Sequence, residues 1–346
     1  MSKQVKIGSL IIGGGAPIAI QSMATFKISD TGRAVEEINR LKPLGLDIMR
    51  FSVTDEKDAK AFCVVKKQVN LPLVADIHFD YKLALMAIDG GADKIRINPG
   101  NVGGEDKVRE IAVALKRNNI PVRIGSNTGS IEKEFLQKYG KNEISLGESA
   151  LAKVALMEKY GVNDIVISVK ASDVDLMVKS YEYVAKKTDC PLHLGVTEAG
   201  TEYTGVIKNS IGIGSLLLKG IGDTIRVSLS ADTDREVIAG KTILSALGLK
   251  NDCAKIIACP TCGRCEWDCM AFAKKVEKYL ENVCVPIKVA VMGCVVNGPG
   301  EAQDADLGVA GAKGGCAIFK KGEVIKTVAF NQLEKEFFAE VDKCLR

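Results

Sequence analysis

Short apolar runs, separated by polar segments of helical character, dominate the first 250 residues of the chain. The runs are rich in Ile, Val and Leu, as in strands that are buried on both faces of a parallel sheet. They lie at residues 18–20, 47–51, 73–77, 94–98, 122–124, 165–169, 192–196 and 224–229. The pattern therefore predicts eight short buried strands.

The segments between these strands have the character of helices. Helices are predicted at residues 31–44, 55–69, 83–89, 104–118, 146–160, 174–187 and 234–247. The first of them follows Ser29 and Asp30, either of which can cap a helix N-terminus. Strands that alternate with helices over about 250 residues predict a (β/α)8 barrel, with a doubly wound open sheet as the alternative.

The alternation stops near residue 250, and a different pattern follows. A helical stretch at residues 270–281, a strand at 287–292 and a Gly-rich region at 308–315 come first. A strand pair around 317–319 and 324–328 and a terminal helix at 333–344 complete the chain. We therefore predict a (β/α)8 barrel over residues 1–250 and a small α+β domain over residues 251–346.

Composition and charge exclude several classes of protein. The 346 residues are 47% hydrophobic, which supports a sizeable core. The net charge of +4 is small and dispersed, which argues against nucleic acid as the main partner. Glycines at 13–15 and Pro17 interrupt the apolar stretch at residues 10–20, so we expect neither a targeting segment nor a membrane span. These features predict a cytoplasmic protein.

Polar residues follow the predicted strands at the end where barrel enzymes hold their catalytic groups. They are Arg50, Asp76, His78, Arg96, Asn98, Arg123, Asn127, Lys170, Thr197, Glu198, Arg226 and Ser228. The cations among them would repel one another around one mouth unless they paired with carboxylates or shared a bound anion. A phosphate or diphosphate would supply that anion, because guanidinium geometry suits its oxygens. His78 carries less weight, because a lone histidine on a strand is more often a core residue.

The cysteines are concentrated in the second predicted domain. Nine of the 11 lie between residues 253 and 344, a density that points to a metal centre in a reducing compartment. Cys259, Cys262, Cys265 and Cys269 follow the C-x2-C-x2-C-x3-C spacing of bacterial ferredoxins, although Met270 replaces the usual proline. Spacing alone nominates these four for an iron–sulfur cluster, or two pairs of them for zinc.

A set of longer motifs carries a more specific signal. The motifs are KIRINPGN (94–101), VRIGSN (122–127), SVKASD (168–173), HLGVTEAG (193–200), IRVSL (225–229), CPTCGR (259–264) and MGCVVNGPGEA (292–302). In this order they resemble the 4-hydroxy-3-methylbut-2-enyl diphosphate synthase family in its two-domain bacterial form. That family belongs to the methylerythritol phosphate route to isoprenoids and uses flavodoxin or ferredoxin.

The resemblance implies a [4Fe–4S] cluster held by Cys259, Cys262, Cys294 and Glu301. The family pattern does not require Cys265 or Cys269, and the roles of these two stay open. A carboxylate binds cluster iron more weakly than a thiolate does. Glu301 could therefore leave and open one iron to the substrate.

The implied reaction is the two-electron reductive dehydration and ring opening of 2-C-methyl-D-erythritol 2,4-cyclodiphosphate to 4-hydroxy-3-methylbut-2-enyl diphosphate. The strand-end cations and Asn127 would hold the diphosphate, and the other strand-end residues would line the substrate site. Glu198 would give a proton to the departing hydroxyl group. The family also implies a homodimer. Two alternatives are a barrel fused to an iron–sulfur electron carrier and a sugar-phosphate enzyme with structural zinc.

Overall fold

The computed structural model describes residues 1–281, 283–295 and 302–345 of the chain. It divides into two compact units, Met1–Leu249 and Lys250–Arg346. None of the described helices has the length and apolar character that a membrane span requires.

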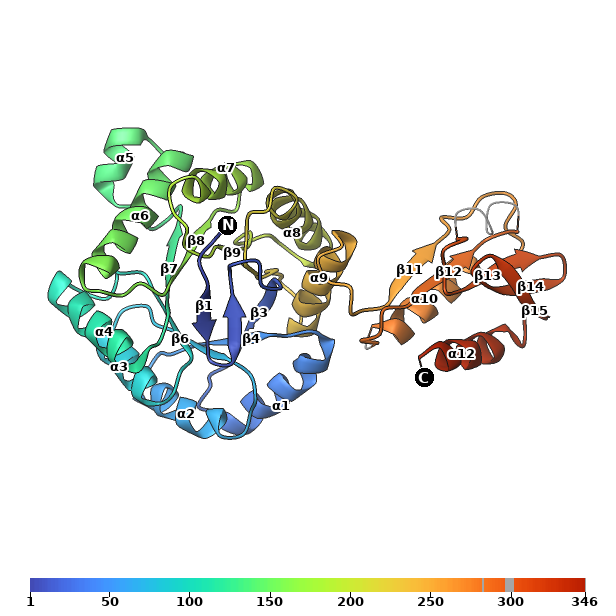
Figure 1. Cartoon of the computed structure of the whole chain (residues 1–346), viewed down its shortest axis with the longest axis horizontal. Coiled ribbons are helices and arrows are strands. Elements are labelled where there is room, and N and C mark those ends of the chain that lie inside the picture. The colour runs from blue at the N-terminus through green and yellow to red at the C-terminus, as the bar shows by residue number, and fades with distance from the viewer. Residues whose placement is uncertain (282, 296–301, 346) are drawn as a thin grey trace. The chain divides into compact units, whose positions relative to one another are not determined.

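The first unit is built around an eight-stranded parallel sheet that curls into a barrel (Figure 1). Its strands are β3 (Ala19–Met23), β4 (Ile48–Ser52), β5 (Leu73–Asp76), β6 (Lys94–Ile97), β7 (Val122–Asn127), β8 (Ile165–Lys170), β9 (His193–Leu194) and β10 (Thr224–Ile225). The strand order is β8-β7-β6-β5-β4-β3-β10-β9. A parallel bridge from Ile167 in β8 to Leu192, just before β9, joins the two ends of the sheet. The predicted barrel is confirmed, and the open sheet is wrong.

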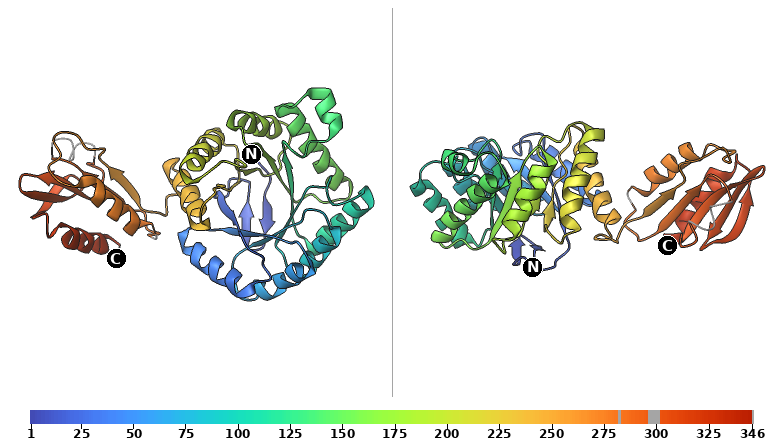
Figure 2. Two further views of the ribbon diagram at one scale, coloured as in Figure 1. Left: turned by 180° about the vertical axis from the view of Figure 1, so that it is seen from behind. Right: turned by 90° about the horizontal axis from the view of Figure 1, so that it is seen from above.

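Helices surround this barrel on the outside (Figures 1 and 2). They are α1 (Thr31–Leu41), α2 (Glu56–Lys66), α3 (Tyr81–Asp89), α4 (Glu105–Asn118), α5 (Lys133–Tyr139), α6 (Glu143–Lys159), α7 (Val174–Ala185), α8 (Glu202–Leu217) and α9 (Thr233–Ala246), with a 3-10 turn, η1 (Lys42–Leu44), after α1. Asp30, Asp55, Asp80 and Asp173 each accept a backbone N–H in the first turn of the helix that follows. The cap predicted at Asp30 is therefore confirmed, whereas α5 and α8 were not predicted.

An N-terminal hairpin closes the amino-terminal end of the barrel (Figures 1 and 2). Its strands, β1 (Val5–Ile7) and β2 (Leu10–Ile12), pair antiparallel. Its side chains Val5, Ile7 and Ile12 share one apolar cluster with residues near the beginnings of barrel strands, namely Ala19, Ile48, Val74 and Val166. This cluster, called the apolar floor below, leaves the carboxyl ends of the strands as the open end of the barrel.

The second unit contains a five-stranded mixed sheet in the order β11-β12-β13-β14-β15. Its strands are β11 (Lys255–Ala258), β12 (Lys288–Met292), β13 (Leu307–Ala312), β14 (Gly315–Lys320) and β15 (Glu323–Val328). Helices α10 (Cys269–Leu280) and α12 (Leu333–Cys344) share one apolar core with this sheet. The predicted α+β fold is confirmed, although the Gly-rich region is largely a strand, β13, and β11 was not predicted.

Candidate active site

Five cationic side chains meet at the carboxyl ends of the barrel strands. Arg50 comes from β4, Arg96 from β6, Arg123 from β7 and Lys170 from β8, and Arg226 follows β10 directly. Parallel register places Arg96 beside Arg123 and Asn127 beside Lys170. With Gly125, Ser126, Asn127, Ser168, Thr197 and Ser228, the five line one pocket of about 110 Å³. This set is called the anion pocket below.

Two glycines make room for the cations in this pocket. A Cβ atom on Gly125 would lie 3.0 Å from Nε and Nη2 of Arg96. A Cβ on Gly195, just after β9, would lie 2.7 Å from Nζ of Lys170. Any larger residue at either position would therefore have to displace a cation.

Two carboxylates in the described part of the chain neutralise some of this charge. Asp76 accepts a hydrogen bond from Nη1 of Arg96 at 3.0 Å, and its other oxygen lies 3.6 Å from Nε of Arg50. Glu236, on α9, pairs with Nη2 of Arg226 at 3.2 Å. Glu236 also accepts from the hydroxyl of Ser22 at 2.8 Å. The strand pattern did not indicate Glu236, because it reaches the site from a helix.

Several guanidinium donors remain without a hydrogen-bond partner among the described residues. They are Nε of Arg50, Arg96, Arg123 and Arg226, and Nη1 of Arg123. Arg123 is 2% exposed and has no carboxylate within 4 Å in the described structure. Buried donors without partners cost free energy, so this arrangement is suited to a bound anion with several acceptor oxygens.

The pKa shifts of the charged residues at the anion pocket arise from burial and from the charges of their neighbours. Burial lowers the pKa of Arg50 to about 10, because the attraction of Asp76 offsets only part of the cost of burial and Arg226 and Arg96 add repulsion. Burial and then repulsion by Arg123 and Arg226 lower the pKa of Lys170 well below its usual value. Although burial opposes ionisation of Asp76, Arg50 and Arg96 together hold the pKa of that carboxyl below its usual range. An anion in the pocket would favour the charged form of each cation.

The remaining strand-end residues lie beside the anion pocket rather than in its lining. His78 is exposed, and its Nε2 lies 3.4 Å from Nη1 of Arg96. Asn98 is buried and bonds to Asn101 and to the backbone of Gly100. Glu198 is exposed on the loop after β9 with a left-handed backbone, φ 52°.

The second unit brings together three of the predicted ligands. Cys259 follows β11 and Cys294 lies just beyond β12, and these strands are parallel neighbours whose carboxyl ends share one edge. The guanidinium of Arg264 bonds to Cys294 and lies near Cys262 and Cys259, and its hydrogen bond to Cys294 followed by the negative charge of the ionised sulfurs raises the pKa of Arg264. The backbone N–H of Thr261 donates to the sulfur of Cys259 at 3.4 Å. Glu301 lies outside the described residues.

Cys265 and Cys269 point toward the core of this unit. The sulfur of Cys265 donates to the carbonyl of Trp267 at 3.2 Å. Cys269 is 1% exposed and belongs to the apolar core, and burial followed by repulsion from Cys265 raises its pKa to about 12.

In the described part of the second unit, no three Cys, His, Asp or Glu side chains are close enough to hold one metal ion. A four-iron cluster spaces its ligands more widely than a single zinc ion does. The three cysteines around Arg264, together with the N–H donor of Thr261, are therefore a candidate set of thiolate ligands.

Comparison with known proteins gives the family. Residues 2–241 match the family model described as "GcpE TIM-barrel domain", and residues 255–343 match "GcpE protein C-terminal domain". The chain belongs to the GcpE family. This assignment confirms the resemblance seen in the sequence motifs.

Curated members of the GcpE family cover nearly the whole chain. The chain is 49% identical over 343 residues to a 4-hydroxy-3-methylbut-2-en-1-yl diphosphate synthase (flavodoxin) of Bacillus velezensis, covering 99% of this chain and 92% of the relative. It is 50% identical over 347 residues to the protein of the same name from Caldanaerobacter subterraneus subsp. tengcongensis, covering 100% of this chain and 98% of the relative.

Solved structures with similar folds cover the barrel of this GcpE-family chain. Dihydropteroate synthase from Xanthomonas albilineans aligns with a TM-score of 0.51 at 13% identity, over 71% of this chain and 99% of that chain. A truncated 3-deoxy-D-arabino-heptulosonate 7-phosphate synthase from Thermotoga maritima aligns with a TM-score of 0.50 at 14% identity, over 71% and 94%. At these identities the likeness concerns the fold alone.

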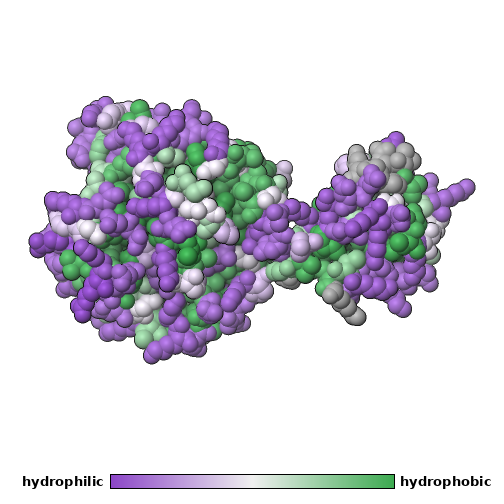
Figure 3. Space-filling model, in the orientation of Figure 1, coloured by the Kyte–Doolittle hydropathy of each residue, from purple (hydrophilic) through white to green (hydrophobic). Residues whose placement is uncertain are grey.

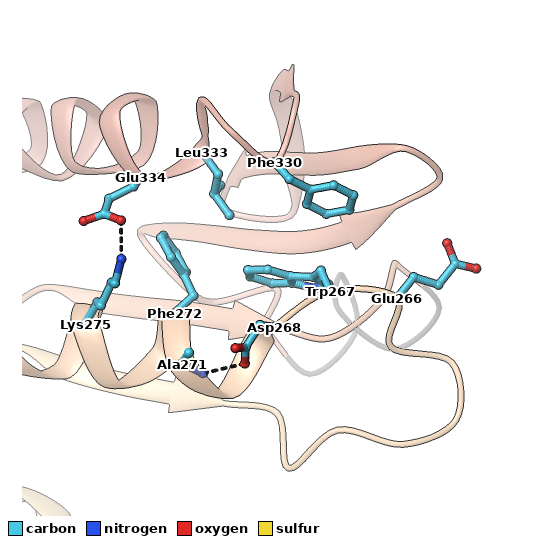
Figure 4. Close-up of a pocket in the computed structure, with 9 residues that line it drawn as sticks. All are labelled: Glu266, Trp267, Asp268, Ala271, Phe272, Lys275, Phe330, Leu333 and Glu334. Atoms are coloured by element: carbon cyan, nitrogen blue, oxygen red, sulfur yellow. Dashed lines mark hydrogen bonds and ion pairs between the residues drawn. The ribbon is translucent and has the colours of Figure 1, made fainter.

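The second unit of this GcpE-family chain also carries an aromatic groove of about 370 Å³ (Figure 4). Trp267, Phe272, Phe330 and Leu333 point into it, and Lys275 and Glu334 form an ion pair at its rim (Figure 4). The indole N–H of Trp267 donates to the carbonyl of Gly293 at 3.1 Å. The groove is therefore joined by one hydrogen bond to the residue that precedes Cys294.

Proposed function

We infer that this chain catalyses the two-electron reductive ring opening of 2-C-methyl-D-erythritol 2,4-cyclodiphosphate to 4-hydroxy-3-methylbut-2-enyl diphosphate. The observation that carries this inference is the anion pocket, where five cations face two described carboxylates. The excess of positive charge complements the negative charge of a diphosphate. The names of the curated relatives support the same reaction.

In the proposed complex, the anion pocket binds and orients the diphosphate. Arg123 and Lys170 supply charge without a described carboxylate partner, whereas Asp76 and Glu236 hold Arg50, Arg96 and Arg226 in place. Two opposite charges 4 Å apart attract by about 4 kcal/mol at an effective dielectric constant near 20. Contacts of this kind fix the ring of the substrate relative to the barrel mouth.

We propose that Cys259, Cys262, Cys294 and Glu301 hold a [4Fe–4S] cluster in the second unit. When bound, the cluster would supply electrons one at a time at a site that a departing carboxylate can open. The N–H of Thr261 and the guanidinium of Arg264 would stabilise the negative charge of the thiolates. Glu301 enters this set on the strength of the family motif.

Glu198 is the proposed proton donor to the departing hydroxyl group. It adjoins Thr197 of the pocket lining, and its left-handed backbone is a strained conformation for a residue other than glycine. Such strain is characteristic of residues that are held in place for function. We assign Asp76, His78, Asn98, Thr197 and Ser228 to the support and lining of the substrate site.

We further propose flavodoxin as the electron donor, because the names of the curated relatives specify it.

A homodimer in the cytoplasm is also proposed. Exposed apolar residues recur every fourth position on α8, at Tyr203, Ile207 and Ile211, and apolar surface gathers over this helix in Figure 3. Light scattering should give twice the chain mass of 37.0 kDa, and Ile211→Asp should shift it toward one chain.

One experiment tests the proposed reaction against its alternatives. The protein is purified without oxygen, and its iron content and its visible and EPR spectra are recorded with and without the cyclodiphosphate. We expect four irons per chain and spectra that change when the substrate binds. A colourless, zinc-loaded protein would refute the cluster, and iron spectra that ignore the substrate would indicate an electron carrier instead.

A further inference from the structure

Lys94, the first residue of β6, is a buried lysine beneath the anion pocket. Its side chain is 0% exposed, and Nζ donates one hydrogen bond, to Oε1 of Gln21 at 3.3 Å. No carboxylate of the described residues lies within 4 Å of it. A buried ammonium normally needs such a counter-charge, so the charged form of Lys94 is poorly supported in the ligand-free protein.

Strand register places this lysine inside the barrel, just above the apolar floor. Lys94 is level with Val74 of the floor, and Gln21 is level with Ile48. His193 pairs with Thr224, which in turn pairs with Ala19 of the floor, so His193 belongs to the same interior layer. Its Nε2 has no described hydrogen-bond partner. Lys94 therefore lies in a polar layer between the floor and the anion pocket, buried from solvent and outside the lining of that pocket.

The charged groups around Lys94 are almost all cationic. The charges that act on it directly are Arg123 on β7 and Arg50 on β4, and the neutral His193 on β9 lies nearby. Arg96, Lys170 and Arg226 belong to the anion pocket, and Asp76 on β5 is a carboxylate beside that pocket. Arg50 and Arg96 already engage Asp76. Burial, and then repulsion by Arg123 and Arg50, lower the pKa of Lys94 well below its usual value.

We propose that diphosphate binding in the anion pocket is coupled to the uptake of one proton from solvent by Lys94. The inference rests on the proposed function of that pocket. An anion beside Arg123 and Arg50 would offset the repulsion that disfavours the ammonium form, so the neutral amine takes a proton as the ligand arrives. Lys94 is thus a positioning residue that adds positive charge below the ligand without touching it.

Coupling of this kind has a measurable signature. The signature appears in the pH range where Lys94 is neutral in the free protein and charged in the complex. In that range one proton is taken up with each ligand, so each rise of one pH unit weakens diphosphate binding about tenfold. Lys153 offers a matched comparison for proton uptake, although not for affinity, because it is also buried but lies 2.8 Å from Glu132 and bonds to Ser149 and to Ser126 of the pocket lining. Its charge already has a partner, so it should take up no proton when the ligand binds.

The test is calorimetric titration of the full chain with inorganic diphosphate at pH 8. Two buffers with different heats of ionisation give the number of protons taken up per ligand. Wild type should take up about one proton more than Lys94→Met, while Lys153→Met should match wild type. Contributions from Lys170 and from diphosphate itself are common to all three proteins and cancel in the comparison.

Equal proton uptake in wild type and Lys94→Met would overturn the proposal. Lys94→Met removes a buried amine at similar length, so it should fold, as thermal unfolding would verify. Lys94→Gln, which retains a polar end opposite Gln21, serves as the second variant and should give the same deficit. Failure of wild type to bind diphosphate at all would count against the anion pocket itself, a result distinct from unaltered proton uptake.

Discussion

Replacing Arg123 with methionine separates binding from folding in the proposed site. Arg123 is almost fully buried, has two guanidinium nitrogens without described partners, and has no carboxylate within 4 Å in the described structure. In the complex, each charge-assisted hydrogen bond to the diphosphate contributes about 1.5–3 kcal/mol. Loss of Arg123 should therefore cost about 3–4 kcal/mol of substrate binding, or roughly 10²- to 10³-fold in kcat/KM.

The same change should have the opposite effect on stability. Methionine removes a buried cation that has no counter-charge, so the ligand-free protein should gain about 1–2 kcal/mol in its free energy of unfolding. Steady-state kinetics with the cyclodiphosphate, thermal unfolding and cluster absorbance measure the three effects separately. Arg40→Met is the control, because Arg40 is exposed on α1 and pairs with Glu37.

Three results would contradict this reasoning. Unchanged kcat/KM in Arg123→Met would show that the pocket does not hold the diphosphate through this residue. A marked loss of stability would show that Arg123 has a structural partner in the free protein. Loss of cluster absorbance with intact folding would place the defect in the second unit rather than in binding.

Four further substitutions test other parts of the site. Cys294→Ser should abolish the cluster absorbance, whereas Cys265→Ser should retain it; the reverse outcome would favour the ferredoxin-like spacing. Glu236→Gln should weaken the hold on Arg226, raise KM and lower the free energy of unfolding by about 2 kcal/mol, measured by denaturant titration. Because folding lowers the pKa of Asp76 below about 3.9, its stabilisation is complete above that pH and is lost as pH falls through the folded pKa. Asp76→Asn should therefore flatten the acid limb of unfolding temperature against pH, and an unaltered limb would refute the assignment.

Much of the anion pocket could be predicted from the sequence, from the cationic residues near the ends of the predicted strands. Cations on the inner face of a barrel strand point toward the shared mouth, and Arg50, Arg96 and Arg123 all line the pocket there, although Arg123 is the second residue of β7 rather than its last. Glu236 was missed because a helix carries it, and no strand periodicity indicates which helical residues turn inward. The pairing of Asp76 with two arginines likewise depends on three-dimensional neighbours.

Glycines explain why the pattern missed two elements, β13 and α8. In β13, a Cβ on Gly308 would lie 2.2 Å from the ring of Phe319, and one on Gly311 would lie 2.5 Å from Trp267. These positions are glycine because neighbouring side chains approach closely, yet a sequence reading takes glycine as a strand breaker. The same holds for α8, where a Cβ on Gly212 would lie 2.6 Å from Met177. Packing overrides propensity in both elements.

The hairpin that forms the apolar floor also has a kinetic consequence. It seals the amino-terminal end of the barrel with Val5, Ile7 and Ile12, and the backbone N–H of Lys3 anchors it to the carbonyl of Asp189. In the proposed reaction, substrate and product would use the same opening and would present a diphosphate to the same five cations. The product should therefore act as a competitive inhibitor of its own formation.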